Sequence, residues 1–224
     1  MNSLKVLNAL TLIGRDALNQ HGLRSDCCIA GTKTAIEVCR YFGIEASGLT
    51  VRAEIFNPEY VKFFDELGRG PKNEEEEYDW RDRGAWICSI GDQDLEPFYE
   101  GKWAGHLVMI ASTEHGSHLI DLTIDQANRP HKNIELSSTH FLIPAEFALK
   151  ESTFMVQNES GCVLVYDSYP NNRVFTQAPD WSNTRRKDRK PLVGQIIRVI
   201  NKMPDRPELE ELPLRIPRLG GKQL

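Results

Sequence analysis

Two adjacent cysteines, Cys27 and Cys28, stand near the beginning of a segment with helical spacing, where a thiol can act as a nucleophile. Unpaired N–H groups and aligned peptide dipoles at a helix start favour a negative charge, so a thiol in the first turn ionises more readily than an ordinary one. A cysteine is also a small apolar residue that is frequently buried and inert. The two thiols alone therefore do not decide between chemistry and packing.

A single buried helix within residues 25–44 is expected to carry these thiols. Ser25 or Asp26 can cap its first turn, and Gly43 can end it in the left-handed conformation. Only one narrow stripe of this helix is polar, so most of its surface is expected to be buried. The stripe consists of Lys33, Glu37 and Arg40.

A histidine and an aspartate on a predicted hairpin can complete the chemistry. The runs 103–111 and 118–123 are apolar, and the short polar link between them contains glycine, which predicts an antiparallel hairpin. In that hairpin His106 faces a position between 121 and 125, so Asp121 and Asp125 are both candidate partners. A thiol nucleophile needs a base that takes its proton, and the base needs a third group that orients its ring. The chain offers these groups in the order Cys, His, Asp.

The composition limits the kind of protein and its partners. A chain of 224 residues with 40% hydrophobic and 26% charged residues suits one soluble domain with appendages. The net charge of −5 and the absence of a Gly-rich phosphate loop or a basic helix argue against nucleic acid as the main partner. No apolar run is long enough to cross a membrane, and the N-terminal residues lack the pattern of a signal peptide. We therefore expect a cytoplasmic protein.

The five cysteines do not form a disulfide framework, because their number is odd and the chain is long. No C-x-x-C or H-x-x-x-H spacing is present, so we expect neither a structural zinc ion nor any other metal or cofactor. Cys39, Cys88 and Cys162 are interpreted as core residues, and His115 and His118 as solvent-facing.

The remaining segments predict an α+β fold in which N-terminal helices pack on an antiparallel sheet. The expected helices are 3–20, with Gly14 on its apolar side, 58–67, and one that starts at Pro191. The expected strands are 49–55, 84–90, 139–143, 153–157 and 162–168. The acidic run within 69–83 and the basic run 185–190 are expected to be solvated loops. Residues 1–202 are expected to form one domain and 203–224 a Pro-rich tail.

Three blocks of sequence resemble the transglutaminase-like branch of the papain-like superfamily. Cys28 is followed after twelve residues by Arg40 and after fifteen by Gly43-Ile44. Gly105-His106 at a strand start is similar to the family's histidine block, and Asp121-Leu122-Thr123 is similar to its Asp-Pro-Thr block. Cys27 matches less well by one position. The resemblance implies that Cys28 is the nucleophile, His106 the general base and Asp121 the orienting acid.

The resemblance covers residues 24–47 and 100–125, and it implies a papain-like core and acyl-transfer chemistry without a cofactor. The expected reaction is hydrolysis of an amide or peptide bond in a peptide or protein substrate. Transfer of the acyl group to an amine, and a non-catalytic binding module on the same fold, are the alternatives. The Cys28 backbone N–H is the expected first oxyanion donor, and Trp103, Gln20 or His21 can supply a second.

Overall fold

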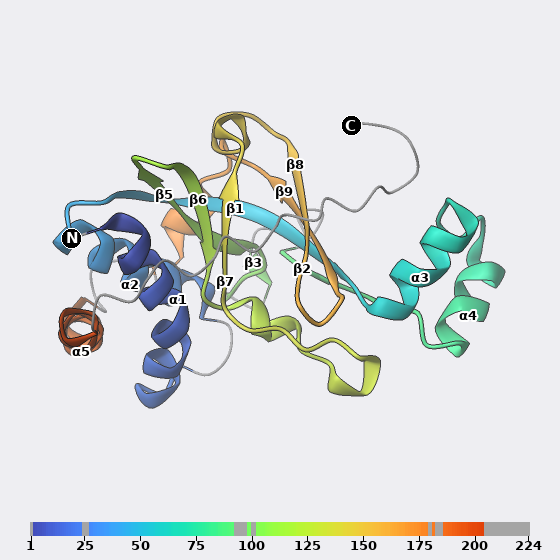
Figure 1. Cartoon of the computed structure of the whole chain (residues 1–224), viewed down its shortest axis with the longest axis horizontal. Helices are drawn as coiled ribbons and strands as arrows, with labels where there is room; N and C mark the ends of the chain where they lie inside the picture. The colour runs from blue at the N-terminus through green and yellow to red at the C-terminus, as the bar shows by residue number, and fades with distance from the viewer. Residues whose placement is uncertain are drawn as a thin grey trace.

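An antiparallel sheet runs through the centre of the molecule, with two helices packed on one of its faces and a third packed against these two (Figure 1). The computed structural model describes residues 2–23, 27–91, 98–99, 102–178, 181 and 186–203, of which 98, 99, 102 and 186–188 are described by backbone alone. The fold is therefore α+β, as the sequence predicts. In these ranges, no helix has both the length and the apolar character needed to cross a membrane.

Within the described residues, seven strands form the main sheet, in the order β7-β6-β5-β1-β9-β8 with β2 also paired to β1. The strands are β1 (Glu45–Phe56), β2 (Ile87–Ile90), β3 (Phe98–Tyr99), β4 (Lys102–Trp103), β5 (His106–Thr113), β6 (Gly116–Asp121), β7 (Thr139–Ile143), β8 (Thr153–Gln157) and β9 (Val163–Ser168). The bounds of β7 and β8 are those expected. The strand expected over 103–111 instead begins at His106, and the one expected over 84–90 begins at Ile87.

Strand β1 is the longest and organises the others along its length. Its first half pairs with β5, from Glu45 opposite Ser112 to Val51 opposite His106. Its second half pairs with β2 on that same side, from Ala53 opposite Ile90 onward, and with β9 on the other side. The start of β5, with His106, therefore lies beside the middle of β1.

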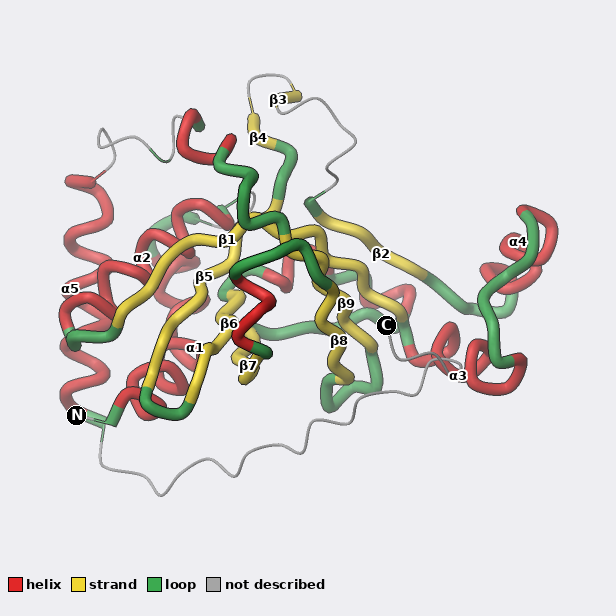
Figure 2. Tube along the Cα trace, turned by 90° about the horizontal axis from the view of Figure 1, so that it is seen from above, coloured by secondary structure: helices red, strands yellow, loops and turns green. Residues whose placement is uncertain are grey.

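Helices α1, α2 and α5 lie together on one face of the sheet, as Figure 2 shows from above. The described α-helices are α1 (Ser3–Gln20), α2 (Cys28–Tyr41), α3 (Pro58–Leu67), α4 (Glu74–Asp82) and α5 (Arg186–Lys202). Alternate residues of β5 point to opposite faces: Met109 joins the cluster formed with these helices, and Val108 joins a second cluster on the other face. The helix expected over 3–20 is confirmed. Within it Gly14 faces Leu122, where an added Cβ would lie 2.9 Å from a leucine methyl carbon.

The prediction that the two charged runs form loops is wrong, because the acidic run and most of the basic run lie in helices. Asn73 caps α4 through a hydrogen bond from the Glu76 N–H, and the four glutamates 74–77 occupy the first turn, where the helix dipole favours negative charge. Most of the basic run lies in α5, which begins at Arg186 and not at Pro191.

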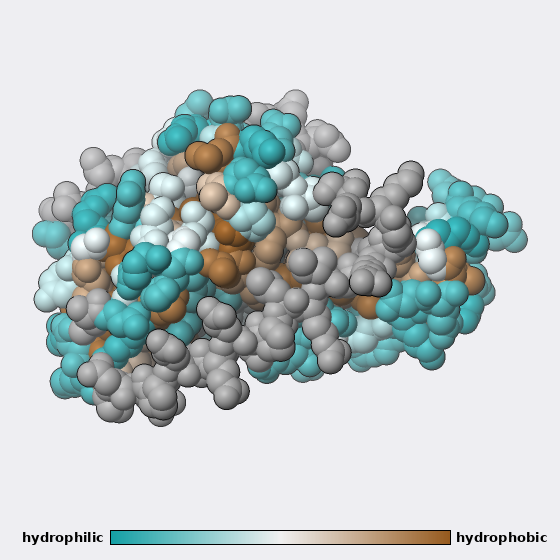
Figure 3. Space-filling view, turned by 45° about the horizontal axis from the view of Figure 1, so that its top comes forward, coloured by the Kyte–Doolittle hydropathy of each residue, from teal (hydrophilic) through white to brown (hydrophobic). Residues whose placement is uncertain are grey.

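The pair α3–α4 projects from the far end of β1, and its surface is largely hydrophilic (Figure 3). Beyond residue 203, the expected tail lies outside the described residues.

His118 is buried and not solvent-facing, which corrects the sequence interpretation. Its Nδ1 lies 2.9 Å from His140 Nε2, and its Nε2 lies 3.1 Å from the Thr113 hydroxyl. His140 Nδ1 in turn lies 2.8 Å from Asn8 Oδ1, which connects the sheet to α1. Burial, together with the neighbouring His118, lowers the pKa of His140 to about 4. His115 lies in the exposed turn, as expected.

This histidine chain makes stability depend on pH. The unfolded chain takes up a proton on His140 near its ordinary pKa of about 6.5, whereas the fold takes it up only near pH 4. The stabilisation is therefore complete above about pH 6.5 and is lost as the pH falls toward 4. Urea unfolding in this range is expected to show a wild-type loss of up to ~1.4 kcal/mol per pH unit beyond that of His140→Gln. His115→Gln is the control and keeps the wild-type slope. Equal slopes for wild type and His140→Gln would contradict this account.

Candidate active site

Cys28 lies in the first turn of α2, as the sequence predicts, but the N-cap is Cys27 and not Ser25 or Asp26, so the helix begins later than expected. The Cys27 side chain makes no capping hydrogen bond, and Ser25 and Asp26 lie outside the described residues. At the other end, Gly43 has a φ of 76°, and the N–H of Ile44 bonds to the carbonyl of Cys39 at 2.9 Å. That bond closes a Schellman motif, so the predicted glycine stop is confirmed.

The hairpin brings His106 and Asp121 together at one end. His106 is the first residue of β5 and Asp121 is the last residue of β6. Antiparallel pairing therefore places both residues at the open end of the hairpin. His106 Nε2 lies 2.7 Å from Asp121 Oδ2, and the two side chains are 3% and 0% exposed. The structure therefore chooses Asp121 over Asp125 as the partner of the histidine.

Two further residues hold the Asp121 carboxylate in place. Its Oδ1 accepts a hydrogen bond from the Thr123 N–H at 2.9 Å, and its Oδ2 accepts one from the Tyr166 hydroxyl at 3.3 Å. From the sequence, Thr123 enters only as part of the Asp-Leu-Thr block, and no role is predicted for Tyr166. A threonine two residues after an aspartate is a common local hydrogen-bond pattern, and a tyrosine on an apolar strand needs a partner for its hydroxyl. Either signal could have led to them.

The electrostatics of His106 favour its protonated form. Burial alone lowers the pKa of a histidine, but the Asp121 charge and hydrogen bond, followed by a hydrogen bond with Cys28 and the charge of Cys28, outweigh it and raise the pKa of His106. Because Nε2 faces Asp121, Nδ1 is the ring nitrogen left for Cys28. His106 therefore stands between the thiol and the carboxylate.

Apolar and aromatic groups surround the Cys28 thiol. Cys28 is 9% exposed and packs with Leu107, the residue after the histidine, and with Phe175. Trp103 and Trp181 complete this cluster, and the Phe175 ring lies 6.0 Å and 4.7 Å from their ring centres. Trp103 therefore lies in the cluster around Cys28, where the second oxyanion donor is expected. Gln20 and His21 are instead hydrogen-bonded to Gln195 of α5.

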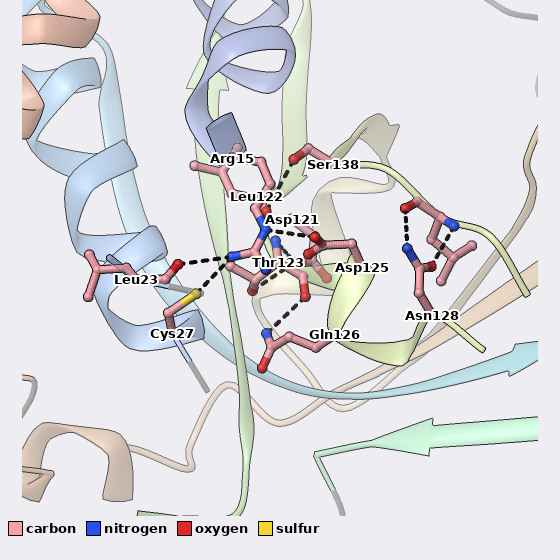
Figure 4. A network of polar contacts seen from close by, with 11 residues as sticks. Arg15, Leu23, Cys27, Asp121, Leu122, Thr123, Asp125, Gln126, Asn128 and Ser138 are labelled. Carbon is pink, nitrogen blue, oxygen red and sulfur yellow. Dashed lines mark hydrogen bonds and ion pairs between the residues drawn. The ribbon is translucent and has the colours of Figure 1, made fainter. Parts of the chain in front are cut away.

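The second thiol, Cys27, contacts Arg15 in a polar network that Figure 4 draws together with Asp121 and Thr123. Arg15 of α1 donates from Nη1 to Cys27 Sγ at 3.0 Å and from Nε to Asp125 Oδ2 at 2.7 Å. Burial raises the pKa of Cys27, although the Arg15 charge opposes that shift. The alternative thiol and the alternative carboxylate therefore both contact Arg15. Of the other cysteines, Cys39 and Cys162 are buried and Cys88 is half-buried.

Gly91, which sequence reasoning also missed, packs against the histidine where β2 and β5 meet. Its φ is +79°, and an added Cβ would lie 2.5 Å from the Val51 carbonyl oxygen and 2.7 Å from His106 Cβ. Only glycine fits this space without moving the His106 backbone.

The chain has no match among protein-family models, curated proteins or solved structures. Within the described ranges, no three His, Cys, Asp or Glu side chains are grouped so that they could hold a metal ion.

Two glycine substitutions test how tightly this site is packed. Gly91→Ala and Gly22→Ala impose the same left-handed strain, since their φ values are +79° and +78°, but Gly22 has open space around it. Gly22→Ala is expected to lower the free energy of unfolding by ~1 kcal/mol, and Gly91→Ala by ~1–3 kcal/mol more because of the overlap with His106. Urea denaturation measures both. Equal losses would contradict the close packing at Gly91.

Proposed function

We propose that the protein is a cysteine-dependent acyl-transfer enzyme with a papain-like, transglutaminase-like arrangement of Cys28, His106 and Asp121. The observation that carries the proposal is the buried 2.7 Å contact between His106 and Asp121 beside a thiol in the first turn of a helix. Burying two ionisable groups in contact is costly unless each is paired. A third ionisable group next to them, able to exchange a proton with the imidazole, is the arrangement that nucleophilic catalysis requires.

The reaction follows from the order of contacts. The thiol proton of Cys28 passes to His106 Nδ1, and the sulfur attacks the carbonyl carbon of the substrate to form a tetrahedral adduct. His106 then returns that proton to the leaving amine as the C–N bond breaks, which leaves a thioester on Cys28. Water attacks the thioester while His106 accepts its proton, and the carboxylic acid leaves as the proton returns to the sulfur.

Asp121 acts by orienting the imidazole and stabilising its charged form. The raised pKa of His106 supports this role, because Asp121 is the largest of the influences that raise it. Thr123 and Tyr166 in turn fix the carboxylate. Tyr166→Phe is therefore a milder change than Asp121→Asn, since it removes one of several contacts to the carboxylate.

The negative oxygen of the adduct needs hydrogen-bond donors. The backbone N–H of Cys28 is one of the first N–H groups of α2, which have no acceptor within the helix. Among the three side chains considered for the second donor, Trp103 is favoured because it packs in the cluster around Cys28. Its indole N–H is a donor only, which suits an oxyanion.

A generic acyl donor tests the proposal without knowledge of the natural substrate. With p-nitrophenyl acetate, the protein is expected to release a burst of p-nitrophenolate and to gain one acetyl group, mapped to Cys28 by peptide mass spectrometry. His106→Gln is expected to slow the burst ~10²–10⁴-fold, because it removes the base. Decay of the acetyl group in water alone indicates a hydrolase, and marked acceleration by an added primary amine indicates the acyltransferase alternative.

Cys27→Ala is the matched control, because Cys27 is the adjacent thiol and faces Arg15. It is expected to keep the burst, whereas Cys28→Ala abolishes it. A burst that persists in Cys28→Ala would contradict the assignment of the nucleophile. No acetyl group on either thiol in the wild type would favour a binding module without catalysis.

A further inference from the structure

The exposed side of the thiol helix lines a groove made of two adjoining hollows. One, of about 450 Å³, lies between α2 and α5, and the other, of about 250 Å³, lies between α2 and a wall that includes Arg173, Phe175, Thr176 and Trp181. The polar stripe of α2 lines both hollows, which makes the groove continuous along the helix. The shared residues are Lys33, Glu37 and Arg40.

The smaller hollow borders the cluster around Cys28. Phe175 and Trp181 line it, and both belong to the cluster around Cys28. Lys33 fixes Trp181 in place, since its ammonium lies 4.5 Å from the centre of the indole ring and donates to the Trp181 carbonyl. A chain that lies in this groove therefore passes next to residues that pack around Cys28.

The charge of the groove is positive although the chain as a whole carries −5. Glu37 is paired with the buried Arg189 at 3.4 Å. Arg40 and Arg173 line the smaller hollow, both are exposed, and neither guanidinium has a hydrogen-bond or ion-pair partner within the part of the chain that the structure describes. Guanidinium groups bind carboxylates through two parallel hydrogen bonds.

We infer that this groove binds an acidic polypeptide segment of the acyl donor, with Arg40 and Arg173 as the groups that recognise its carboxylate. The inference rests on the proposed function and adds the substrate class. Arg40 follows Cys28 by twelve residues, or ~18 Å along the helix. An extended peptide covers ~3.3 Å per residue, which places the acidic side chain about five residues from the reacting acyl group.

Peptide binding tests the groove directly. Two hexapeptides with a neutral fluorophore, identical except for Glu or Gln at the fifth position, are titrated with the protein at low salt and followed by fluorescence anisotropy. The Glu peptide is expected to bind about tenfold more tightly, as one charge-assisted pair predicts. Arg40→Gln and Arg173→Gln are each expected to reduce that ratio, and the double variant to abolish it. Arg81→Gln, which alters an exposed arginine on α4, is the control and keeps the ratio.

A reactive version of the same peptides locates the bound chain. With a bromoacetyl group at the amino end, the Cys28 sulfur displaces bromide and forms a carbon–sulfur bond. The Glu peptide is expected to label Cys28 faster than the Gln peptide, and Arg40→Gln to remove that difference.

The outcomes separate the two proposals. Equal binding of the Glu and Gln peptides would overturn the groove assignment, as would a preference that survives in the double variant. Failure of Cys28 to take an acetyl group from p-nitrophenyl acetate would contradict the enzyme. In that case a Glu preference in binding would support the groove, and labelling at a cysteine other than Cys28 would overturn its connection to the thiol.

Discussion

The contact between His106 and Asp121 is the interaction on which the rest of the site depends. Both side chains are almost fully buried, and burying either ionisable group without its partner would destabilise the fold. The pairing of β5 with β6 brings both residues to one end of the hairpin. Gly91 has no side chain that would overlap with His106 beside the middle of β1. The sheet thus holds an ionisable pair in a fixed orientation, and α2 packs its first turn against that pair. The proposed chemistry requires this rigidity because a proton must move between the sulfur and the imidazole.

Helix α2 serves this arrangement at two places. Its first turn carries the thiol, and its one polar stripe lines a groove that borders the cluster around this thiol. The Arg15 network attaches α1 to the helix start and to the 3-10 helix η1 (Ile124–Ala127), which follows Asp121 closely. Arg15 therefore connects Cys27, the residue before the nucleophile, with Asp125, which lies four residues after the orienting acid. The proposed enzyme would have its reactive group, Cys28, and one of its two substrate-binding arginines, Arg40, on one helix.

Local patterns predicted most of the elements and the central residues of the site. Apolar periodicity indicated α1, α3 and most of the sheet, and the hairpin limited the partner of His106 to positions near 121–125. Contacts between distant segments could not be predicted in this way. The burial of His118 depends on α1 and β7, and the role of Gly91 depends on the junction of two strands on β1. The acidic run was misread because a cap and the helix dipole outweigh repulsion among the glutamates.

The central claim is that Cys28 and His106 share a proton, and the pH dependence of alkylation tests it most directly. The rate at which iodoacetamide modifies Cys28 is measured between about pH 5 and pH 9, in the wild type and in His106→Gln. The account predicts that Cys28 of the wild type stays reactive at about pH 6, whereas in His106→Gln its rate falls about tenfold for each pH unit below the titration of an ordinary thiol. Identical pH profiles for the two proteins would contradict it.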